Sequence, residues 1–249
     1  MSPPAEPAPP LDSPLPDPSG PLPNTFLAQL PAPARAALLS IGTPQRYPAG
    51  APLFHQGDPS QHVVIIESGW VKVTSISRLG WEALLAIRGA GDILGELSAV
   101  DGRPRLATVR GLTPVETTVI AADRLRRCLL EQPEITLSLL RHLAASLREA
   151  DGRRAEYGAS NGDSRLAGLL LELVSRHGVR TAEGVVIDLP LTQQDLAASV
   201  GASREVVART LRILRDREIV LTRRRQIIVV RPELLRSLAR SVSIPTDAP

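Results

Sequence analysis

The side chains of this chain that are best suited to chemistry are charged ones, concentrated in the segment GASREVVARTLRILRD, residues 201–216. Glu205, Arg209 and Arg212 recur at helical spacing, and Arg204 would project from the first turn of the same helix. A guanidinium can donate two hydrogen bonds to a guanine edge, and a carboxylate can accept one from a cytosine amino group. We therefore expect contacts to base edges in duplex DNA, although an ordinary amphipathic helix with a solvated charged face would show the same spacing.

Two helices joined by a tight turn are expected to present these side chains. Thr192 and Asp195 are spaced to cap a first helix, Gly201 would end it, and Ser203 can cap the second helix. The second helix has an apolar stripe for a core, which consists of Val207, Leu211 and Leu214. The first helix would then support the second helix in a groove of the DNA.

A β-hairpin is expected directly after the second helix, as a wing. Two β-branched runs, IVLT and QIIVV, flank the turn Arg223-Arg224-Arg225. Between Ser203 and Arg231, nine arginines against three acidic residues give a formal balance of +6, which suits a phosphate backbone. The alternative is that the turn arginines keep an edge strand soluble. The candidate DNA-binding residues are Thr192, Gln193, Ser203, Arg204, Glu205, Arg209, Arg212, Arg223, Arg224 and Arg225.

Composition restricts the protein to a few classes. Its 249 residues allow two domains, and a net charge of only +3 means that the basic character is local to the C-terminal part. Cys128 is the single cysteine, which excludes an intrachain disulfide and cysteine-clustered metal sites, and its leucine neighbours predict a buried position. No apolar run reaches the ~20 residues that span a bilayer, and the N-terminus does not have the pattern of a secretory signal. We expect a cytoplasmic protein with no membrane contact.

The sequence divides into four segments. Residues 1–24 contain ten prolines, which predicts a disordered or partly polyproline-like tail. Residues 25–132 combine a short helix, Phe26 to Ile41, with β-rich runs separated by Gly, Pro and Asp, as in an antiparallel β-roll. Residues 133–160 are expected to form a dimerisation helix and hinge, and residues 161–249 the winged helix-turn-helix. The expected fold class is α+β.

A second group of polar residues lies inside the predicted roll. Gly95 would let the backbone approach a ligand closely, and Glu96 would accept a hydrogen bond from a ribose hydroxyl. An arginine, Arg103 or Arg105, would face a phosphate held by backbone N–H groups at the start of a short helix. By spacing alone, a salt bridge between the glutamate and an arginine explains the same residues.

Three segments make the chain resemble the cyclic AMP receptor/fumarate-nitrate regulator family of bacterial transcription factors. They are FHQGDPSQHVVIIESGWVKV, GELSAVDGRPRLATV and GASREVVARTLRILRD. The second resembles the phosphate-binding cassette of that family, the third resembles its recognition helix, and the match runs from about Leu27 to Val230. The resemblance implies a cyclic-nucleotide-binding-type β-roll, a long dimerisation helix and a C-terminal winged helix-turn-helix, in that order.

The resemblance also implies an effector site for cyclic AMP. The implied effector-binding residues are Gly95, Glu96, Leu97, Arg105, Leu106, Ala107 and Asp151. Glu96 would hold the ribose 2′-hydroxyl and Arg105 the phosphate, with Arg103 as a substitute. Gly95 and Leu97 would form a backbone floor, and Ala107 would contribute a backbone N–H. Leu106 departs from the Ser, Thr or Ala that is common in the family, because it offers no hydroxyl to the phosphate and would narrow the pocket.

A coiled-coil seam is predicted on the helix between the domains, and it favours a parallel homodimer. Its residues recur at alternating three- and four-residue steps and are Leu140, Leu143, Leu147 and Ala150. Family members that bind cyclic AMP present a Thr-Ser pair to adenine near the end of this helix, whereas Ala150 and Asp151 stand at those positions. Only Asp151 can accept a hydrogen bond from the adenine amino group. Gly152 weakens the helix there, which would suit a hinge.

The resemblance further implies a TGTGA-like half-site that Arg204, Glu205 and Arg209 read in the major groove. Double-stranded DNA and RNA polymerase are the implied partners, and residues 179–185 are the candidate polymerase surface.

Other functions remain as alternatives. The first is the same regulator with a different effector or with none. A haem sensor would need axial ligands, and a lone helical histidine such as His142 is usually a surface or packing residue. A cyclic-nucleotide-regulated enzyme or an interaction module is the last alternative, but no nucleophile with a base, phosphate loop or metal-ligand cluster follows the roll. We therefore expect no catalytic residue, no metal and no covalent cofactor.

Overall fold

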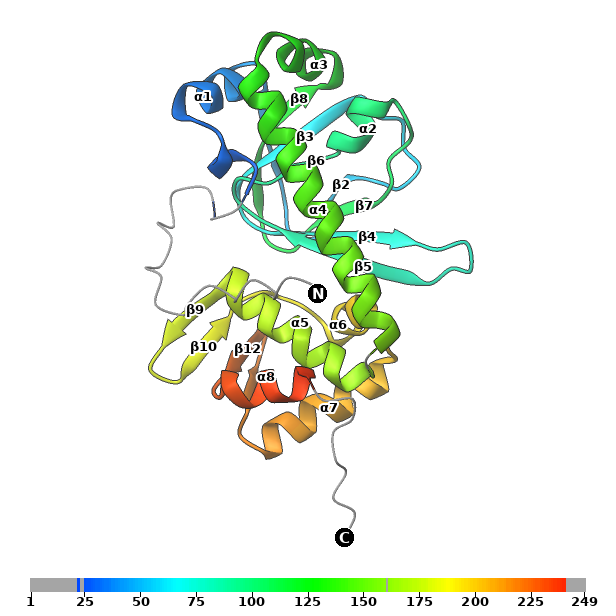
Figure 1. The fold of residues 1–249 in the computed structure, drawn as a ribbon, viewed down its shortest axis with the longest axis vertical. Helices are drawn as coiled ribbons and strands as arrows, with labels where there is room; N and C mark the ends of the chain where they lie inside the picture. The colour runs from blue at the N-terminus through cyan, green and yellow to red at the C-terminus, as the bar shows by residue number, and fades with distance from the viewer. Residues whose placement is uncertain (1–21, 23–24, 160, 241–249) are drawn as a thin grey trace, which may run out of the picture.

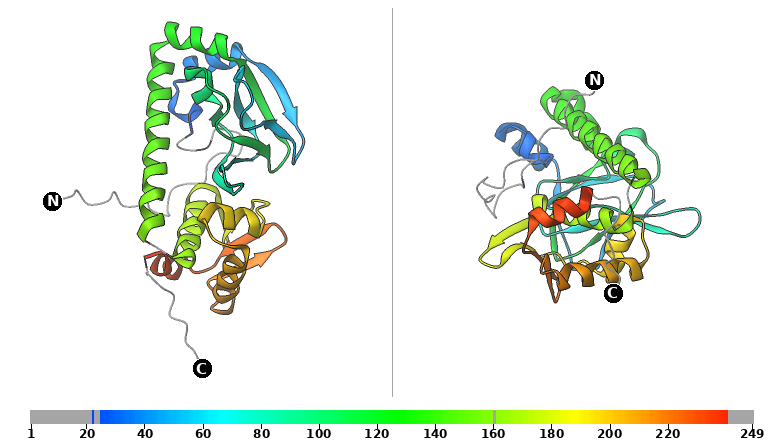
Figure 2. Two further views of the ribbon diagram at one scale, coloured as in Figure 1. Left: turned by 90° about the vertical axis from the view of Figure 1, so that its right-hand side faces the viewer. Right: turned by 60° about the horizontal axis from the view of Figure 1, so that its bottom comes forward.

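The computed structural model describes Leu22, residues 25–159 and residues 161–240, so the predicted tail, residues 1–24, lies outside it apart from Leu22. In the described part of the chain, a β-roll and a C-terminal domain are joined by one long helix (Figure 1). Figure 2 shows this helix running along one side of the molecule, from the roll to the C-terminal domain. The order of elements confirms the expected fold class.

Eight short strands make up the described part of the roll. They are β1 (Thr43–Tyr47), β2 (Pro52–Phe54), β3 (His62–Ser68), β4 (Val71–Ile76), β5 (Glu82–Arg88), β6 (Ile93–Leu94), β7 (Thr108–Gly111) and β8 (Val115–Ala121). They form two antiparallel sheets with the strand orders β1-β8-β3-β6 and β2-β7-β4-β5. Along β3, Val63 and Ile65 face one apolar cluster while Val64 and Ile66 face another, because side chains alternate across a strand. The continuous run of four apolar residues is therefore a strand buried on both faces.

Helices supply the remainder of the core on one side of the roll. They are η1 (Leu27–Gln29), α1 (Ala32–Ser40), α2 (Glu96–Asp101), α3 (Ala122–Glu131) and the long α4 (Pro133–Ala159). The single helix predicted from Phe26 to Ile41 is in two pieces, because Leu30 is extended before Pro31, as expected of a residue that precedes proline. Cys128 is buried in this cluster, as predicted.

Part of the apolar surface of α4 lies outside the core. Leu140 is 58% exposed and Leu147 is 63% exposed, and Ala150 is exposed as well. Leu143 instead packs partly against the core of the roll. Leu137, which the sequence pattern did not single out, extends the exposed stripe.

The hinge expected at Gly152 is not a helix break. α4 continues through this residue to Ala159, because a glycine inside a helix costs only ~1 kcal/mol relative to alanine. The next helix begins at Gly162, where the side chain of Asn161 accepts a hydrogen bond from the Ser164 N–H and caps the first turn.

The C-terminal domain contains the predicted helix pair and wing. Its elements are α5 (Gly162–His177), β9 (Gly178–Thr181), β10 (Gly184–Ile187), α6 (Gln193–Val200), α7 (Arg204–Asp216), β11 (Val220–Arg223), β12 (Gln226–Val229) and α8 (Pro232–Arg240). The wing is half of a four-stranded sheet of order β11-β12-β10-β9, because β10 pairs with β12. Residues 179–185, the candidate polymerase surface, lie in a second hairpin that β9 and β10 form. None of the described helices is both long enough and apolar enough to cross a membrane.

A buried histidine on α4 couples the stability of the roll to pH. His142 is 8% exposed and meets the ring of Phe26 edge-to-face, with 6.0 Å between ring centroids. Burial lowers the pKa of His142 from 6.5 to about 4. The side chain therefore has a packing role, as expected of a lone helical histidine.

We expect the free energy of unfolding to decrease as the pH falls from 6.5 towards 4, because only the unfolded chain then binds the proton of His142. One such group contributes a slope of at most ~1.4 kcal/mol per pH unit. His142→Gln should remove that contribution in urea titrations between pH 7.5 and 4.5, while His177, whose pKa burial also lowers to about 4, keeps its own. The exposed His55→Gln is the control, and an equal slope in wild type and His142→Gln would contradict the assignment.

Candidate functional site

The cassette of the roll begins at Gly95, which has a backbone conformation that suits glycine. Its φ is +80°, in the left-handed region, and it caps the N-terminus of α2. A Cβ atom at this position would lie 2.1 Å from Nη1 of Arg105. Both the backbone angle and the close approach of Arg105 therefore require a residue without a side chain.

Arg105 is the buried cation of the cassette, with 3% of its surface exposed. Nη1 donates to the carbonyl oxygen of Gly95 at 3.0 Å, and Nη2 donates to the carbonyl oxygen of His62 at 2.5 Å. The guanidinium carbon lies 4.2 Å from the centroid of the Phe54 ring, in a cation–π contact. Two of the five N–H groups are thus used, and Nε is buried with no partner in the described residues.

Glu96 follows Gly95 in the first turn of α2 and is half-buried. Burial raises the pKa of its carboxyl, while Arg88 and Arg105 act in the opposite direction. The structure thus brings the glycine, the glutamate and the arginine of the predicted cassette together. The salt bridge proposed from spacing is not formed, because the guanidinium donates its hydrogen bonds to two carbonyl oxygens.

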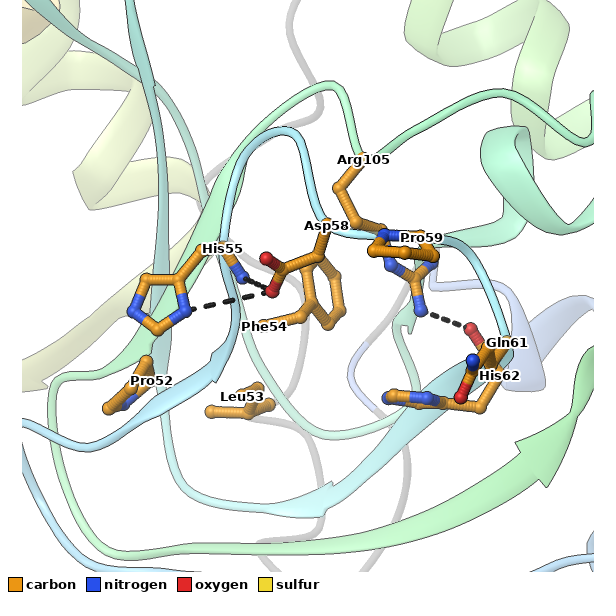
Figure 3. A pocket seen from close by; sticks show the side chains of 9 residues that line it. All are labelled: Pro52, Leu53, Phe54, His55, Asp58, Pro59, Gln61, His62 and Arg105. Atoms are coloured by element: carbon orange, nitrogen blue, oxygen red, sulfur yellow. Dashed lines mark hydrogen bonds and ion pairs between the residues drawn. The ribbon is translucent and has the colours of Figure 1, made fainter.

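A cavity of about 330 Å³ opens beside Arg105 (Figure 3). Its lining comes from β2, the loop that follows it, the first residue of β3, and Arg105. The lining residues are Pro52, Leu53, Phe54, His55, Asp58, Pro59, Gln61, His62 and Arg105. Asp58 accepts a hydrogen bond from the backbone N–H of His55 at 2.8 Å, which fixes the turn at the mouth. Burial, with a smaller contribution from the Arg105 charge, lowers the pKa of His62. The cavity therefore has a mixed polar and apolar lining, with one buried cation on its wall.

The other predicted effector residues are placed differently. Ala107 is buried, whereas Leu97 and Leu106 are 46% and 64% exposed. Of the predicted effector residues, only Arg105 lines the cavity, so the expectation that Leu106 narrows the effector pocket stays a prediction. Asp151 is exposed on α4, and neither it nor Ala150 lines the cavity. Arg103, the substitute for Arg105, is exposed and lies 3.9 Å from an Asp101 carboxylate oxygen.

The helix-turn-helix has the caps that the sequence predicts. The Thr192 side chain accepts a hydrogen bond from the Asp195 N–H, and the Asp195 carboxylate accepts one from the Thr192 N–H, which together form a capping box. Gly201 ends α6 with φ +57°, and the Ser203 hydroxyl accepts from the Val206 N–H at 3.3 Å to cap α7. The turn between the helices is therefore held at both ends by local hydrogen bonds.

The two faces of α7 separate as expected. Its apolar stripe is buried and consists of Val207, Leu211 and Leu214. Arg204, Glu205 and Arg212 are exposed on the other side. Hydrogen bonds from its own backbone N–H and from Ser203 lower the pKa of Glu205, which is thus ionised at the start of the helix. α7 lies at the end of the molecule opposite the roll (Figure 1).

Two of the predicted DNA-binding arginines already have partners. Arg209 lies 3.4 Å from the Asp163 carboxylate of α5. Arg223 is the last residue of β11 rather than part of the turn, and it pairs with Glu183 at 2.8 Å. Arg224 and Arg225 make the two-residue turn, and both are exposed. At the start of α6, Thr192 is exposed and Gln193 is half-buried.

Some contacts of Arg105 and Asp195 were not predicted from the sequence. Phe54 and His62 hold Arg105, but their types carry no signal for that role. Lys72 of β4 forms an ion pair with Asp195 of α6 at 2.5 Å. A signal did exist here, because Lys72 is the one lysine among 29 basic residues of the sequence.

Two family models match the chain. A cyclic nucleotide-binding domain matches residues 44–132, and a Crp-like helix-turn-helix domain matches residues 164–238. Among curated proteins, the chain is 34% identical over 207 residues to the CRP-like cAMP-activated global transcriptional regulator of Mycobacterium tuberculosis, covering 83% of this chain and 92% of that protein. It is 29% identical over 185 residues to the global nitrogen regulator of Nostoc sp., covering 74% of this chain and 83% of that protein.

Among solved structures, the fold is similar to that of CLP, the c-di-GMP responsive global regulator of Xanthomonas campestris. The TM-score is 0.71 at 22% sequence identity, and the match covers 80% of this chain and 99% of that one.

We expect Gly95→Ala to destabilise the roll more than Gly50→Ala does. Both glycines have φ near +80°, but a Cβ at Gly50 meets no atom within 4 Å, whereas one at Gly95 displaces the Arg105 guanidinium. Left-handed backbone strain costs both variants ~1 kcal/mol, and the displaced cation should add ~1–3 kcal/mol at Gly95 alone. Urea unfolding followed by circular dichroism measures the difference, and equal losses would show that the close approach to Arg105 does not matter.

Proposed function

Because this chain belongs to the CRP/FNR family of bacterial transcription regulators, we propose that it is a homodimer that binds a TGTGA-like palindromic site through the major groove under the control of a cyclic nucleotide, cyclic AMP. Its named relatives are transcription regulators rather than enzymes. The site-specific part of the proposal depends mainly on one observation, the exposed Arg-Glu start of α7 on a helix that two caps and a buried stripe hold in place.

The reading face of α7 has the chemistry that a guanine- and cytosine-containing half-site needs. Arg204 and Arg209 can each donate two hydrogen bonds to a guanine, and Glu205 can accept from a cytosine or adenine amino group. Arg209 is only loosely held by Asp163, at 3.4 Å, so it can exchange this partner for a base. Arg212, one turn further along, remains a candidate for the same groove or its phosphates.

The backbone of the DNA would be held by groups around this face. Arg224 and Arg225 project from the wing turn and would neutralise phosphates without reading sequence. Arg223 shares its charge with Glu183 in an exposed pair, which is weak enough to be replaced by a phosphate. Thr192, Gln193 and Ser203 lie at the starts of α6 and α7, where helix N-termini favour anions.

We propose that two chains pair through the exposed stripe of α4. Leu140, Leu147 and Ala150, with the half-buried Leu143 beside them, supply a/d-type positions for a parallel coiled coil. The two reading helices would then face half-sites one helical turn apart, ~34–36 Å. Such a protein would act in the cytoplasm, and RNA polymerase is its proposed partner, with the β9–β10 hairpin as the candidate surface.

The phosphate and ribose end of the cassette fits a cyclic nucleotide. Arg105 is held in place by two carbonyl oxygens and a ring, and its unused N–H groups include the unpartnered Nε. Gly95 keeps space for the guanidinium, and Glu96 lies next to it in sequence. Backbone groups of Leu97 and Ala107 would complete the floor. The purine end would be completed by Asp151 of the exposed α4 face, which the proposed dimer covers.

A bound nucleotide would supply a phosphate charge for Arg105 and a ribose hydroxyl for Glu96. Its effect on DNA binding could not exceed its difference in affinity for the DNA-binding and non-binding arrangements of the protein. The alternative is a regulator with another effector or none. One observation favours it: two carbonyl oxygens and the Phe54 ring engage the guanidinium of Arg105, and Leu106 offers no hydroxyl to a phosphate.

We expect Arg204→Ala and Arg224→Ala to weaken DNA binding in different ways. Arg204→Ala should abolish the preference at one guanine, at a cost of ~1–3 kcal/mol for the preferred site. Arg224→Ala should weaken binding to all sequences alike and reduce its salt dependence. Selection from a random DNA library, with affinities measured at two salt concentrations, distinguishes the effects. The same selected motif for wild type and Arg204→Ala would refute the base-reading assignment.

We expect cyclic AMP to raise the affinity of the wild type for its selected site by about 5–150-fold, the usual range of an allosteric coupling. Arg105→Gln should abolish this rise, because the buried cation is lost. Arg103→Gln, which removes an exposed arginine of the same cassette, should leave the rise unchanged and serves as the control. Fluorescence anisotropy with and without the nucleotide is the measurement. Equal wild-type affinities would favour the alternative with a different effector or none.

A further inference from the structure

The roll and the DNA-binding domain of one chain share an apolar interface that the proposed function does not use. Leu84 and Ile87 of β5 belong to the same buried cluster as Leu196 and Val200 of α6. Trp70, which precedes β4, packs against this cluster as well. The DNA-binding domain is therefore seated directly on the roll, in addition to its attachment through α4.

An aromatic contact closes one edge of this interface. The ring of Trp70 meets the ring of His177, at the end of α5, edge-to-face with 4.6 Å between centroids and an angle of 81°. Gly89 leaves the space for the indole, because a Cβ there would lie 2.4 Å from the Trp70 ring. Trp70 is therefore a natural reporter of whether the two domains are in contact.

An ion pair joins the same interface to the helix-turn-helix. Nζ of Lys72 lies 2.5 Å from Oδ1 of Asp195, and the two side chains are 21% and 10% exposed. The other carboxylate oxygen accepts from the N–H of Thr192 at 2.9 Å and from its hydroxyl at 2.7 Å. Burial alone would raise the pKa of Asp195, but the hydrogen bonds from Lys72 and Thr192 outweigh it and lower the pKa. One carboxylate thus caps α6 and binds the roll.

A separate ionic cluster joins α5 to α4 through side chains of these two helices. Arg176 pairs with Glu149 at 2.9 Å, and Arg153 contacts Glu172 at 3.3 Å. Arg153 also donates to the carbonyl oxygen of Leu85 in β5 at 2.6 Å. This cluster holds α5, the first helix of the DNA-binding domain, whereas the Lys72–Asp195 pair acts directly on α6, the first helix of the helix-turn-helix.

We propose that Lys72 is a positioning residue for DNA recognition, which acts through Asp195 to hold α6, and with it α7, in one placement relative to the roll and the dimer helix. The inference rests on the proposed DNA-binding function. The pair is compatible with bound DNA, since α7 lies at the end of the molecule opposite the roll and its reading residues are exposed (Figure 1). A domain released from the roll would occupy the binding-competent placement only part of the time, and apparent affinity falls with that fraction.

The test uses the full-length chain in a Trp81→Phe background, so that Trp70 is the single tryptophan. Trp81 is 76% exposed, which makes its replacement benign. In this background we compare Lys72→Met, Lys72→Arg, Asp195→Asn and the double variant Lys72→Met/Asp195→Asn. Trp70 emission and acrylamide quenching are recorded on the free protein, and affinity for the selected DNA site is measured by anisotropy.

Lys72→Met should shift Trp70 emission to the red, increase quenching and weaken DNA binding about tenfold, equivalent to ~1.4 kcal/mol. Lys72→Arg should restore most of both signals, because a cation is again present. In the Asp195→Asn background, Lys72→Met should have little further effect, since the two residues act as a pair. Arg46→Gln is the matched control, because it breaks the exposed Arg46–Glu116 pair inside the roll.

Two results would overturn the proposal. One is an equal loss of affinity from Lys72→Met in both backgrounds, which would mean that Lys72 does not act through Asp195. The other is unchanged Trp70 emission and quenching in a folded Lys72→Met protein, which would mean that the pair does not hold the domains together. Failure of the wild type to bind any duplex would refute the proposed function instead, and the emission measurements on the free protein would still decide whether the interdomain contact depends on Lys72.

Discussion

A buried charge must be paired or hydrogen-bonded, and this requirement organises both candidate sites of the molecule. In the roll, Arg105 satisfies it with the carbonyl oxygens of Gly95 and His62 and with the Phe54 ring, so a loop, a helix start and a strand converge on one guanidinium. In the DNA-binding domain, Asp195 satisfies it with Thr192 and Lys72, so a helix cap and a strand of the roll converge on one carboxylate. Each charge thereby fixes the relative positions of segments that are distant in the sequence.

Features that depend on neighbours in the sequence could be predicted, because their physics is local. The capping box of Thr192 and Asp195, the helix end at Gly201 and the apolar stripe of α7 follow from spacing alone, and all are present. The order of the domains followed from the resemblance of three segments. The split of the first helix at Pro31 was missed, although the preference of residues before proline for extended backbone was enough to predict it.

Contacts across the fold could not be predicted from single positions. Nothing in the types of Phe54 and His62 says that they will surround an arginine some fifty positions away, since many partners would satisfy the same charge. The pairing of β10 with β12 was not predicted for a similar reason, because the β-branched sequence of a hairpin does not determine which other strand it pairs with. Leu143 shows the limit of periodicity: the heptad spacing places it on the seam, but in the fold it packs partly against the core of the roll.

The shared carboxylate of Asp195 has a consequence for how the two domains can move. Lys72 of β4 and Thr192, the N-cap of α6, both bind the Asp195 carboxylate. A movement of β4 must therefore either stretch the ion pair or carry α6 with it. Helices and strands transmit such displacements as rigid bodies, since packed interfaces switch between discrete arrangements rather than deform continuously. The apolar cluster that Leu84 and Ile87 share with Leu196 makes a partial slip costly for the same reason. Any signal from the roll must therefore either break this interface as a unit or move α6 and α7 together with the strand of the roll. Breaking the interface costs the free energy that holds it together, and a ligand can supply that free energy only through its difference in affinity for the two arrangements.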